Sequence, residues 1–379
     1  MDNTSSAVKK STQRFHFVDG LRGFAAMWVV LFHAKFHLTA LMAMLPGVVN
    51  HSIFIAGENG VAVFFVLSGF VIAYSVRNAP NTFAFLARFA LRRSVRLDPP
   101  YWASMVVVGI FAFISARVTH TQIEFPGWYS VAVHMAYMQE LLGVKEINTV
   151  YWTLTYEIQF YIIYILCRNI APRIGPAIWI LMFLVAIAWG SGLVHENIVT
   201  GLFVNKWYAF FLGVLAFHAR EDGRVATALF ILAAACSLGS VISGELFQIA
   251  TAITAMVLYL AITLDRMSDW LNWRWIQFLG LISYSLYLTH NPVTGASFYV
   301  WKKLFGESPL SEFAGLFFVI AVCIVFAAGF WWTFERFSIR LARELATPSG
   351  SKVGNLLRWN VQPKRPAIAS GSSISKSDV

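Results

Sequence analysis

Two ionisable residues with side chains suited to chemistry, Arg22 and His33, lie in the first long apolar stretch of the sequence. Their separation of eleven residues places them on one face of an α-helix, about 20° apart around the axis and about 16 Å apart along it. A guanidinium group binds anions, and a neutral imidazole can act as a general base. His33 therefore predicts a buried base, although a histidine that only bonds a neighbouring helix would give the same sequence.

A cluster of arginines precedes the third apolar stretch, within residues 92–102. Arg93 and Arg96 are three positions apart, so their side chains are neighbours if this segment is helical. Two guanidinium groups held side by side form a receptor for a phosphate or pyrophosphate group. Arginines at the end of a membrane span are also the commonest topology signal, so an ordinary anchoring role is the alternative.

Two further apolar stretches contain side chains that need polar partners. Glu157 lies about two turns inside the fourth stretch, where it could orient an imidazole, position a hydroxyl group or pair with a buried cation. Tyr284 and His290 belong to a stretch rich in serine and tyrosine that contains Pro292 near its middle. Because a proline interrupts helical hydrogen bonding, His290 either lines a cavity or caps the freed backbone carbonyls.

The composition is that of a membrane protein. Hydrophobic residues make up 58% of the 379 residues, charged residues only 13%, and the mean hydropathy is +0.63, whereas soluble domains carry about 25% charged residues. The net charge of +10 does not indicate nucleic-acid binding, because the basic residues are dispersed among short connections. The three cysteines are far apart in apolar sequence and predict neither a disulfide framework nor a metal site.

Membrane-spanning helices must therefore position these residues. A bilayer core requires roughly 20 apolar residues per span, and on this basis we predict an all-α, polytopic fold with about ten transmembrane helices. The shorter and more polar stretch 128–142 predicts an interfacial or re-entrant helix. The predicted spans are 22–44, 60–76, 99–116, 150–167, 176–194, 201–218, 226–243, 247–264, 277–299 and 313–333.

The distribution of basic residues predicts how the chain is oriented. With ten spans, most of the 29 Lys and Arg residues fall on one side of the membrane. Cytoplasmic connections are the ones enriched in Lys and Arg, so both termini are predicted to be cytoplasmic. Residues 1–340 are predicted to form the membrane domain, and residues 341–379, rich in Ser, Pro and basic residues, a disordered basic cytoplasmic tail.

The opening motif and the arginine pair resemble those of membrane-bound acyltransferase family 3. Residues 17–26 followed by His33 resemble the family's first span, in which a basic residue, here Arg22, precedes a histidine by ten intervening residues. Arg93 and Arg96 match the family's Arg-x-x-Arg pair at the third span. These motifs occur here in the order in which the family has them.

Three later segments extend the resemblance. Residues 59–70 are similar to the family's second span, 152–157 to its Trp-Ser-Leu-x-x-Glu element, and 283–292 to its Ser-Tyr-Ser-x-Tyr-Leu-x-His-x-Pro element. The chain departs from the family pattern at Asp98, where relatives usually carry an aromatic or apolar residue, and at Asn291, where a bulky apolar residue is frequent. The donor entrance and the acceptor site are therefore the places where this chain should differ from its relatives.

The resemblance covers roughly residues 15–340 and implies a multi-pass enzyme of the bacterial inner membrane. It implies transfer of an acyl group, with acetyl expected, from cytoplasmic acyl-CoA to a hydroxyl of an extracytoplasmic glycan or lipid-linked glycan, such as an O-antigen, exopolysaccharide, glucan or lipo-oligosaccharide. Acyl-CoA is then a co-substrate, membrane lipids are further partners, and no permanently bound cofactor or metal is implied. We also expect the stand-alone form, without a C-terminal SGNH domain.

The resemblance and the placement of charges together imply roles for individual residues. His33 is expected to act as the general base, with Glu157 as its catalytic partner. A covalent acyl intermediate on His33 is the alternative to direct transfer. The expected donor-binding residues are Arg22, Arg93 and Arg96, and the expected acceptor or supporting residues are His290, Tyr284 and Asp19.

Two other functions fit the same residues. In a proton-coupled transporter or flippase, His33, Glu157 and His290 would relay protons while arginines bind an anionic substrate. Paired interrupted spans from inverted repeats would favour that function, and the sequence does not clearly show them. An acyltransferase that modifies a small natural product such as a macrolide would keep the chemistry and change only the acceptor.

Overall fold

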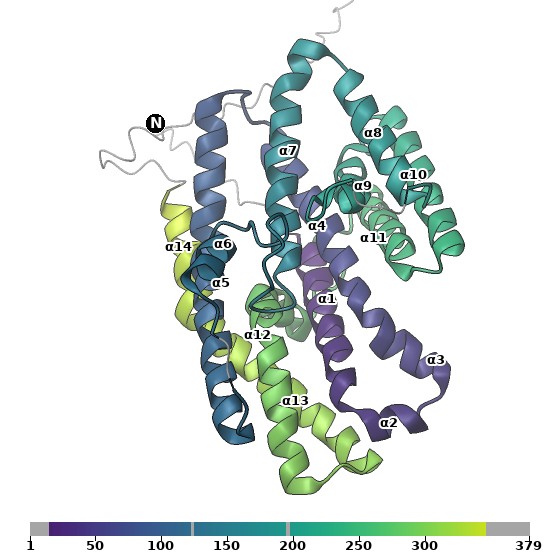
Figure 1. Cartoon of the computed structure of the whole chain (residues 1–379). Helices are drawn as coiled ribbons and strands as arrows, with labels where there is room; N and C mark the ends of the chain where they lie inside the picture. The colour runs from purple at the N-terminus through teal and green to yellow at the C-terminus, as the bar shows by residue number, and fades with distance from the viewer. Residues whose placement is uncertain (1–14, 123–124, 195–197, 346–379) are drawn as a thin grey trace, which may run out of the picture.

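The computed structural model describes residues 15–122, 125–194 and 198–345, and all regular secondary structure in these ranges is helical. The all-α prediction is confirmed. Helices α1 and α12 pack along each other near the centre, α4 packs against α9, and α5 runs along one side with α14 (Figure 1). The α-helices are α1 (His16–Ala34), α2 (Thr39–Met44), α3 (Gly47–Val49), α4 (Gly60–Val76), α5 (Phe83–Thr119), α6 (Trp128–Met135), α7 (Trp152–Ile174), α8 (Ala177–Gly190), α9 (Trp207–His218), α10 (Gly223–Ser243), α11 (Leu246–Thr263), α12 (Arg274–Phe305), α13 (Pro309–Phe330) and α14 (Arg336–Glu344).

Within the described residues, six helical segments are long and apolar enough to cross a membrane by length and composition. They are His16–His37, Gly47–Val76, Phe83–Thr119, Gly223–Ser243, Leu246–Thr263 and Pro309–Glu344. Helices α7 and α12 are more polar but have 23 and 32 residues, so they also have the length of a span. Helices α8 and α9 have 14 and 12 residues. Helix α6 has only 8 residues and is too short to cross a bilayer.

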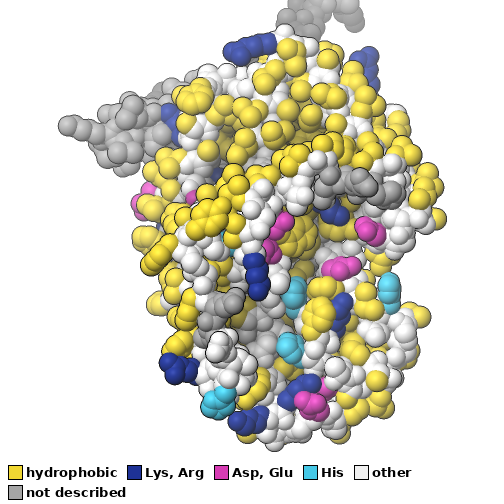
Figure 2. Space-filling model, in the orientation of Figure 1, with side chains coloured by type: hydrophobic (Ala, Val, Ile, Leu, Met, Phe, Trp, Pro, Cys, Tyr) yellow, Lys and Arg dark blue, Asp and Glu magenta, His cyan; other side chains and the backbone are white. Residues whose placement is uncertain are grey.

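Large apolar side chains cover the outside of these helices, as expected where a protein faces lipid. Figure 2 shows one such face, with hydrophobic side chains over much of it, acidic and histidine side chains around its centre and lower end, and basic side chains there and at its upper edge. Exposed examples come from several helices and include Phe113, Leu184, Val241, Phe317 and Val325. The surface is therefore that of a protein embedded in a membrane.

The predicted boundaries of the first and third spans were wrong. The first helix begins at His16 rather than at residue 22, because Phe17 packs on the Trp270 ring and its backbone N–H donates to the Met267 carbonyl (3.0 Å). A break after His37 then separates α1 from α2. The third helix begins at Phe83 rather than at residue 99, so the arginine-rich segment is itself helical.

The predicted tail is only partly described. Helix α14 continues to Glu344, so the first residues assigned to the tail are helical. Residues 346–379, which make up most of the predicted tail, lie outside the described residues.

A close crossing of α1 and α12 positions the candidate site. A Cβ atom added to Gly280 would lie 2.1 Å from the Asp19 carbonyl oxygen, and one added to Gly23 would lie 2.7 Å from the Gly280 nitrogen. Only glycine fits at such distances, and small residues allow helix backbones to approach each other in membranes. The crossing brings Arg22 of α1 next to Ser283 of α12, and both residues line one pocket.

The connection between α6 and α7 holds two carboxyl groups close together outside the apolar spans. Burial, reinforced by the neighbouring Glu140, raises the pKa of Glu146 to about 8. Glu146 is therefore protonated in the folded protein at neutral pH. Because its pKa in the folded state is the higher one, its contribution to stability is full below about pH 4.5 and is lost as the pH rises through about 8.

We expect the melting temperature of the purified protein to fall between pH 6 and pH 9, and Glu146→Gln to reduce that fall, because glutamine cannot lose a proton. Thermal unfolding in detergent at several pH values measures this. Glu245→Gln, an exposed glutamate before α11, is the matched control and should retain the wild-type fall. An equal pH dependence in Glu146→Gln and in the wild type would refute the role of Glu146.

Candidate active site

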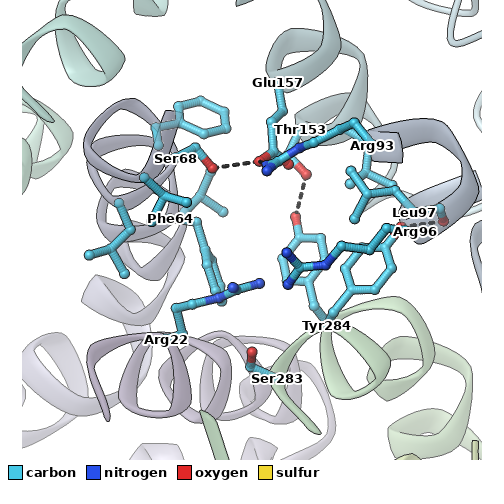
Figure 3. Close-up of a pocket in the computed structure, with 16 residues that line it drawn as sticks. Arg22, Phe64, Ser68, Arg93, Arg96, Leu97, Thr153, Glu157, Ser283 and Tyr284 are labelled. Carbon is cyan, nitrogen blue, oxygen red and sulfur yellow. Dashed lines mark hydrogen bonds and ion pairs between the residues drawn. The ribbon is translucent and has the colours of Figure 1, made fainter. Parts of the chain in front are cut away.

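A pocket between α1, α4, α5, α7 and α12 brings together all three arginines predicted to bind the donor (Figure 3). Glu157 and Tyr284 lie in the same pocket, so five of the predicted site residues meet here although they come from four different helices. The other lining residues are mostly apolar, with Ser68, Thr153, Ser283 and Tyr287 as the remaining polar side chains. The pocket can therefore hold an anionic group next to an apolar wall.

Glu157 forms an ion pair with Arg93. Its Oε1 atom lies 3.2 Å from Arg93 Nη2 and accepts hydrogen bonds from Ser68 Oγ (2.5 Å) and from the Tyr161 hydroxyl. The Arg93 guanidinium also stacks on the Tyr161 ring, 4.0 Å from its centroid. Of the three roles considered for Glu157, the geometry corresponds to pairing with a buried cation. The expected contact with the imidazole of His33 is absent from the described residues, because Glu157 faces a different pocket.

Arg22 and Arg96 form the other half of the cationic lining. Their guanidinium groups point toward each other across the pocket in Figure 3. Within the described parts of the chain, neither group makes a hydrogen bond or a close ion pair, in contrast to Arg93. Two like charges facing each other over a cavity favour an anion between them, because each charge raises the cost of the other when the space is empty.

Glu335 provides charge compensation that the sequence analysis missed. It ends the π-helix η5 (Trp331–Glu335), is 5% exposed, and accepts hydrogen bonds from the Ser285 nitrogen (3.2 Å) and hydroxyl (2.6 Å). Its carboxylate attracts both Arg22 and Arg96 electrostatically. An isolated carboxylate at the end of a long apolar stretch was a signal that could have identified it.

The two supporting residues Tyr284 and Asp19 lie near the arginines rather than near His33. Tyr284 lines the arginine pocket, and its hydroxyl donates to the Leu97 carbonyl (3.0 Å). Asp19 lines neither of the two pockets; its backbone forms the α1–α12 crossing, and its charge attracts Arg96. Neither residue is therefore placed to contact an acceptor at His33.

A second pocket contains His33. Besides His33, its walls carry four aromatic side chains, one of them a tyrosine, three other polar side chains and three valines. The lining residues are Val29, Phe32, His33, Phe36, Glu58, Val61, Thr149, Val150, Trp152, Tyr287 and Asn291. Glu58 and Thr149 were not identified from the sequence, because nothing in their neighbourhood marks them as different from other loop residues. This pocket offers His33 a ligand space distinct from the arginine pocket.

His33 and the fully buried His290 form a hydrogen-bonded pair. His33 Nδ1 lies 3.2 Å from His290 Nε2, and the two ring centroids are 4.8 Å apart. His33 Nδ1 is also 3.0 Å from the Val29 carbonyl oxygen, and His290 Nδ1 is 2.8 Å from the Tyr287 carbonyl oxygen. Carbonyl oxygens only accept, so both Nδ1 atoms carry protons and both Nε2 atoms carry lone pairs. The single Nδ1 proton of His33 is then shared between the Val29 carbonyl oxygen and the Nε2 lone pair of His290. The Nε2 lone pair of His33 is left to act as a base.

Pro292 has a structural consequence beside this pair. It lacks a backbone N–H, so the carbonyl of Leu288 one turn earlier accepts instead from the side chain of Asn148 (Nδ2–O 3.3 Å). Asn148 Oδ1 in turn accepts from Asn291 Nδ2 (3.1 Å), which also donates to Thr149 Oγ1 (3.0 Å). The proline thus fastens the loop before α7 to α12 and fixes one wall of the His33 pocket.

The two pockets adjoin. Both are lined by Val61 of α4 and Tyr287 of α12, so a single layer of side chains separates the arginines from His33. The Tyr287 hydroxyl lies 2.8 Å from Thr153 Oγ1 and donates to the Val150 carbonyl (3.1 Å), which holds the ring in place. Two ligand spaces that meet at one wall suit a reaction between two substrates that enter separately.

Comparison with known proteins places this arrangement in a family. The family model described as an acyltransferase domain matches residues 15–328. The chain is 26% identical over 307 residues to the membrane-bound transacylase BcsY of Komagataeibacter xylinus, which covers 73% of this chain and 72% of that protein. It is 28% identical over 168 residues to acyltransferase MdmB of Streptomyces mycarofaciens, covering 42% and 41% of the two chains.

A third relative, nodulation protein 10 of Rhizobium leguminosarum bv. viciae, is 28% identical over 158 residues, or 38% of this chain and 41% of that protein. The chain thus spans less than half the length of two of these three relatives. No solved structure matches it. The family match nevertheless covers most of the chain, including Arg22, His33, Arg93, Glu157 and His290. The chain belongs to the acyltransferase 3 family of membrane-bound acyltransferases.

Proposed function

We propose that this protein is a transmembrane O-acyltransferase that moves an acyl group, with acetyl expected, from cytoplasmic acyl-CoA to a hydroxyl of an extracytoplasmic glycan. The observation that carries the proposal is the pair of adjoining pockets, one lined by arginines and the other by His33. A donor bound on one side and an acceptor bound on the other would meet at Val61 and Tyr287. Neither substrate then needs to cross the membrane whole.

The arginine pocket suits the phosphate groups of acyl-CoA. Arg22 and Arg96 would hold a phosphate between them, and Arg93 would shape the pocket through its pair with Glu157. This division of roles differs from the sequence-based expectation, in which all three arginines bind the donor. With its phosphates held there, the thioester would point along the apolar lining toward the shared wall.

The His33 pair suits the chemical step. His33 Nε2 takes the proton of the acceptor hydroxyl while the hydroxyl oxygen attacks the thioester carbonyl carbon. The carbon–sulfur bond then breaks, the ester remains on the acceptor, and the proton on His33 passes to the departing CoA thiolate. His290 stabilises the imidazolium form of His33 by accepting its Nδ1 proton in a hydrogen bond.

The proposed topology places the arginine pocket toward the cytoplasm. Ten crossings are obtained if α7, α12 and the shorter helices α8 and α9 cross in addition to the six apolar segments. Both termini are then cytoplasmic, and the connections rich in Lys and Arg lie on that side. We propose a location in the inner membrane of a bacterium, where acyl-CoA is available on one face and surface glycans on the other.

Mass spectrometry of cell-surface glycans tests the proposal directly. Cells with the wild-type gene are expected to carry an acyl ester that cells lacking the gene do not carry, and the mass difference identifies the acyl group. An ester found instead on a small secreted product would favour the natural-product acyltransferase. No difference in any ester between the two strains would refute acyl transfer and favour a transporter.

His290→Ala is expected to lower kcat by about 10–100-fold, the effect typical of losing a group that orients a catalytic side chain, here His33. His290→Gln should retain more activity than alanine, because its side-chain carbonyl can still accept the His33 Nδ1 proton. Steady-state transfer in proteoliposomes measures kcat and the KM for acyl-CoA separately. A positioning role predicts that kcat falls while the donor KM changes little; wild-type kcat in both variants would exclude it.

A further inference from the structure

We infer that the His33 pocket selects a neutral, hydroxyl-rich sugar ring and disfavours acidic sugars, with Glu58 and Asn291 as the specificity-determining residues. The inference rests on the proposed function, because it concerns the acceptor of that reaction. The hydrogen-bonding groups that the pocket presents determine the chemical class of acceptor that it can bind.

The backbone of Glu58 is held at a fixed position on the pocket wall. It belongs to the 3-10 helix η3 (Ile55–Asn59), which packs so tightly on α1 that a Cβ atom at Gly57 would lie 2.4 Å from the Trp28 carbonyl oxygen. On the other side of Glu58, the buried Asn59 donates from Nδ2 to the Ala56 carbonyl (3.0 Å). The backbone on both sides of Glu58 is therefore fixed against the helix that carries His33.

Asn291 presents an oxygen atom to the pocket. Its side-chain nitrogen has two hydrogens, and it donates to Asn148 Oδ1 (3.1 Å) and to Thr149 Oγ1 (3.0 Å). With both hydrogens used, only the carbonyl oxygen Oδ1 remains for a ligand. The hydrogen-bond network that begins at Pro292 thus fixes the position of this wall and also makes Asn291 an acceptor toward a ligand.

The strongest polar groups available to a ligand are therefore all acceptors. They are the Glu58 carboxylate, Asn291 Oδ1 and the Nε2 lone pair of His33. A ligand must supply donors to satisfy them, and neighbouring hydroxyl groups on a sugar ring do so. A carboxylate or phosphate on the ligand would meet hydrogen-bond acceptors and the like charge of Glu58, which is unfavourable. Thr149 retains a hydroxyl that can donate to a ring or glycosidic oxygen.

The rest of the wall also suits a sugar. Phe32, Phe36 and Trp152 provide flat apolar surfaces against which the C–H face of a ring can pack. Two lysines attract Glu58 electrostatically, but neither lines the pocket. The ammonium group of Lys35 lies 3.9 Å from the centre of the Phe32 ring, and that of Lys206 lies 4.4 Å from the centre of the Phe247 ring. The carboxylate is therefore the charge that the pocket presents.

The test uses the unacylated glycan isolated from cells that lack the gene, which is the natural acceptor before the reaction. Wild type, Glu58→Gln and the control Glu245→Gln are compared in proteoliposomes with acetyl-CoA, and mass spectrometry identifies which sugar of the glycan carries the ester. We expect the ester on a neutral sugar. We expect the acceptor KM to rise about ten- to a hundredfold in Glu58→Gln, the effect of losing a hydrogen bond to a charged group, and to stay at the wild-type value in the control.

Each outcome decides a different question. An ester on an acidic sugar, or an unchanged acceptor KM in Glu58→Gln, would overturn this inference while leaving acyl transfer intact. The absence of any ester difference between cells with and without the gene would refute the proposed function, and the inference would fail with it. Comparing the amount of each variant in the membrane, and its elution as a single species in detergent, separates loss of binding from loss of folding.

Discussion

Replacing His33 with alanine is expected to lower the rate of acyl transfer by about 10²–10⁴-fold, the usual contribution of a general base. Among the described residues, His33 is the only histidine that lines either pocket. The rate is measured as ester formed on the unacylated glycan in proteoliposomes supplied with acetyl-CoA. The same variant should leave cells without the ester that the wild-type gene restores.

His51→Ala is the matched control for that experiment, because His51 is exposed on the segment before α4 and lines neither pocket. It should transfer acyl groups at the wild-type rate. If the ester still forms at the wild-type rate in His33→Ala, then His33 is not the base, and the His33–His290 pair would be a structural contact only. An acyl group found covalently attached to His33 after a brief incubation with donor alone would instead indicate a two-step reaction.

Replacing either Arg22 or Arg96 with alanine is expected to raise the KM for acyl-CoA by about ten- to a hundredfold. A hydrogen bond to a charged group contributes about 1.5–3 kcal/mol, and each guanidinium would make such bonds to a phosphate. Lysine at either position should restore part of the affinity, because it keeps the charge but not the planar pair of donors. The KM for the acceptor should change much less, because both arginines lie in the other pocket.

Arg92→Ala is the control for the arginine variants, since Arg92 is exposed on the same helix and lines neither pocket. Its donor KM should equal that of the wild type. Unchanged donor KM values in both Arg22→Ala and Arg96→Ala would contradict phosphate binding between them. In that case the arginines would serve only to orient the chain in the membrane, which was the alternative considered from the sequence.

Much of the site could be predicted from helical periodicity and from the free-energy cost of placing charge in an apolar segment. The separation of Arg22 and His33 along one helix predicted that they share one face of it, and the structure places them in adjoining pockets. The spacing of three positions predicted that Arg93 and Arg96 are neighbours, and the cost of charge in an apolar segment singled out Glu157. These inferences depend only on local sequence, which is why they required no knowledge of how the helices pack.

The partners of these residues could not be predicted, because they depend on contacts between distant segments. Arg93 and Glu157 pair across 64 positions, and His33 and His290 across 257. Nothing in the local pattern indicates that Glu157 meets an arginine instead of a histidine. The start of α1 at His16 is set in the same way, by packing on Trp270 rather than by the polarity of its own residues.

The layer formed by Val61 and Tyr287 has a consequence for the energetics of the cell. On the proposed topology it separates water on one side of an energised membrane from water on the other, and each elementary charge that crosses 100 mV releases about 2.3 kcal/mol. A continuous aqueous path past His33 would let protons run down that gradient. On that topology the anchored ring of Tyr287 would also act as a seal, and an acetyl group, which carries no charge, would be the part of the donor that has to pass it.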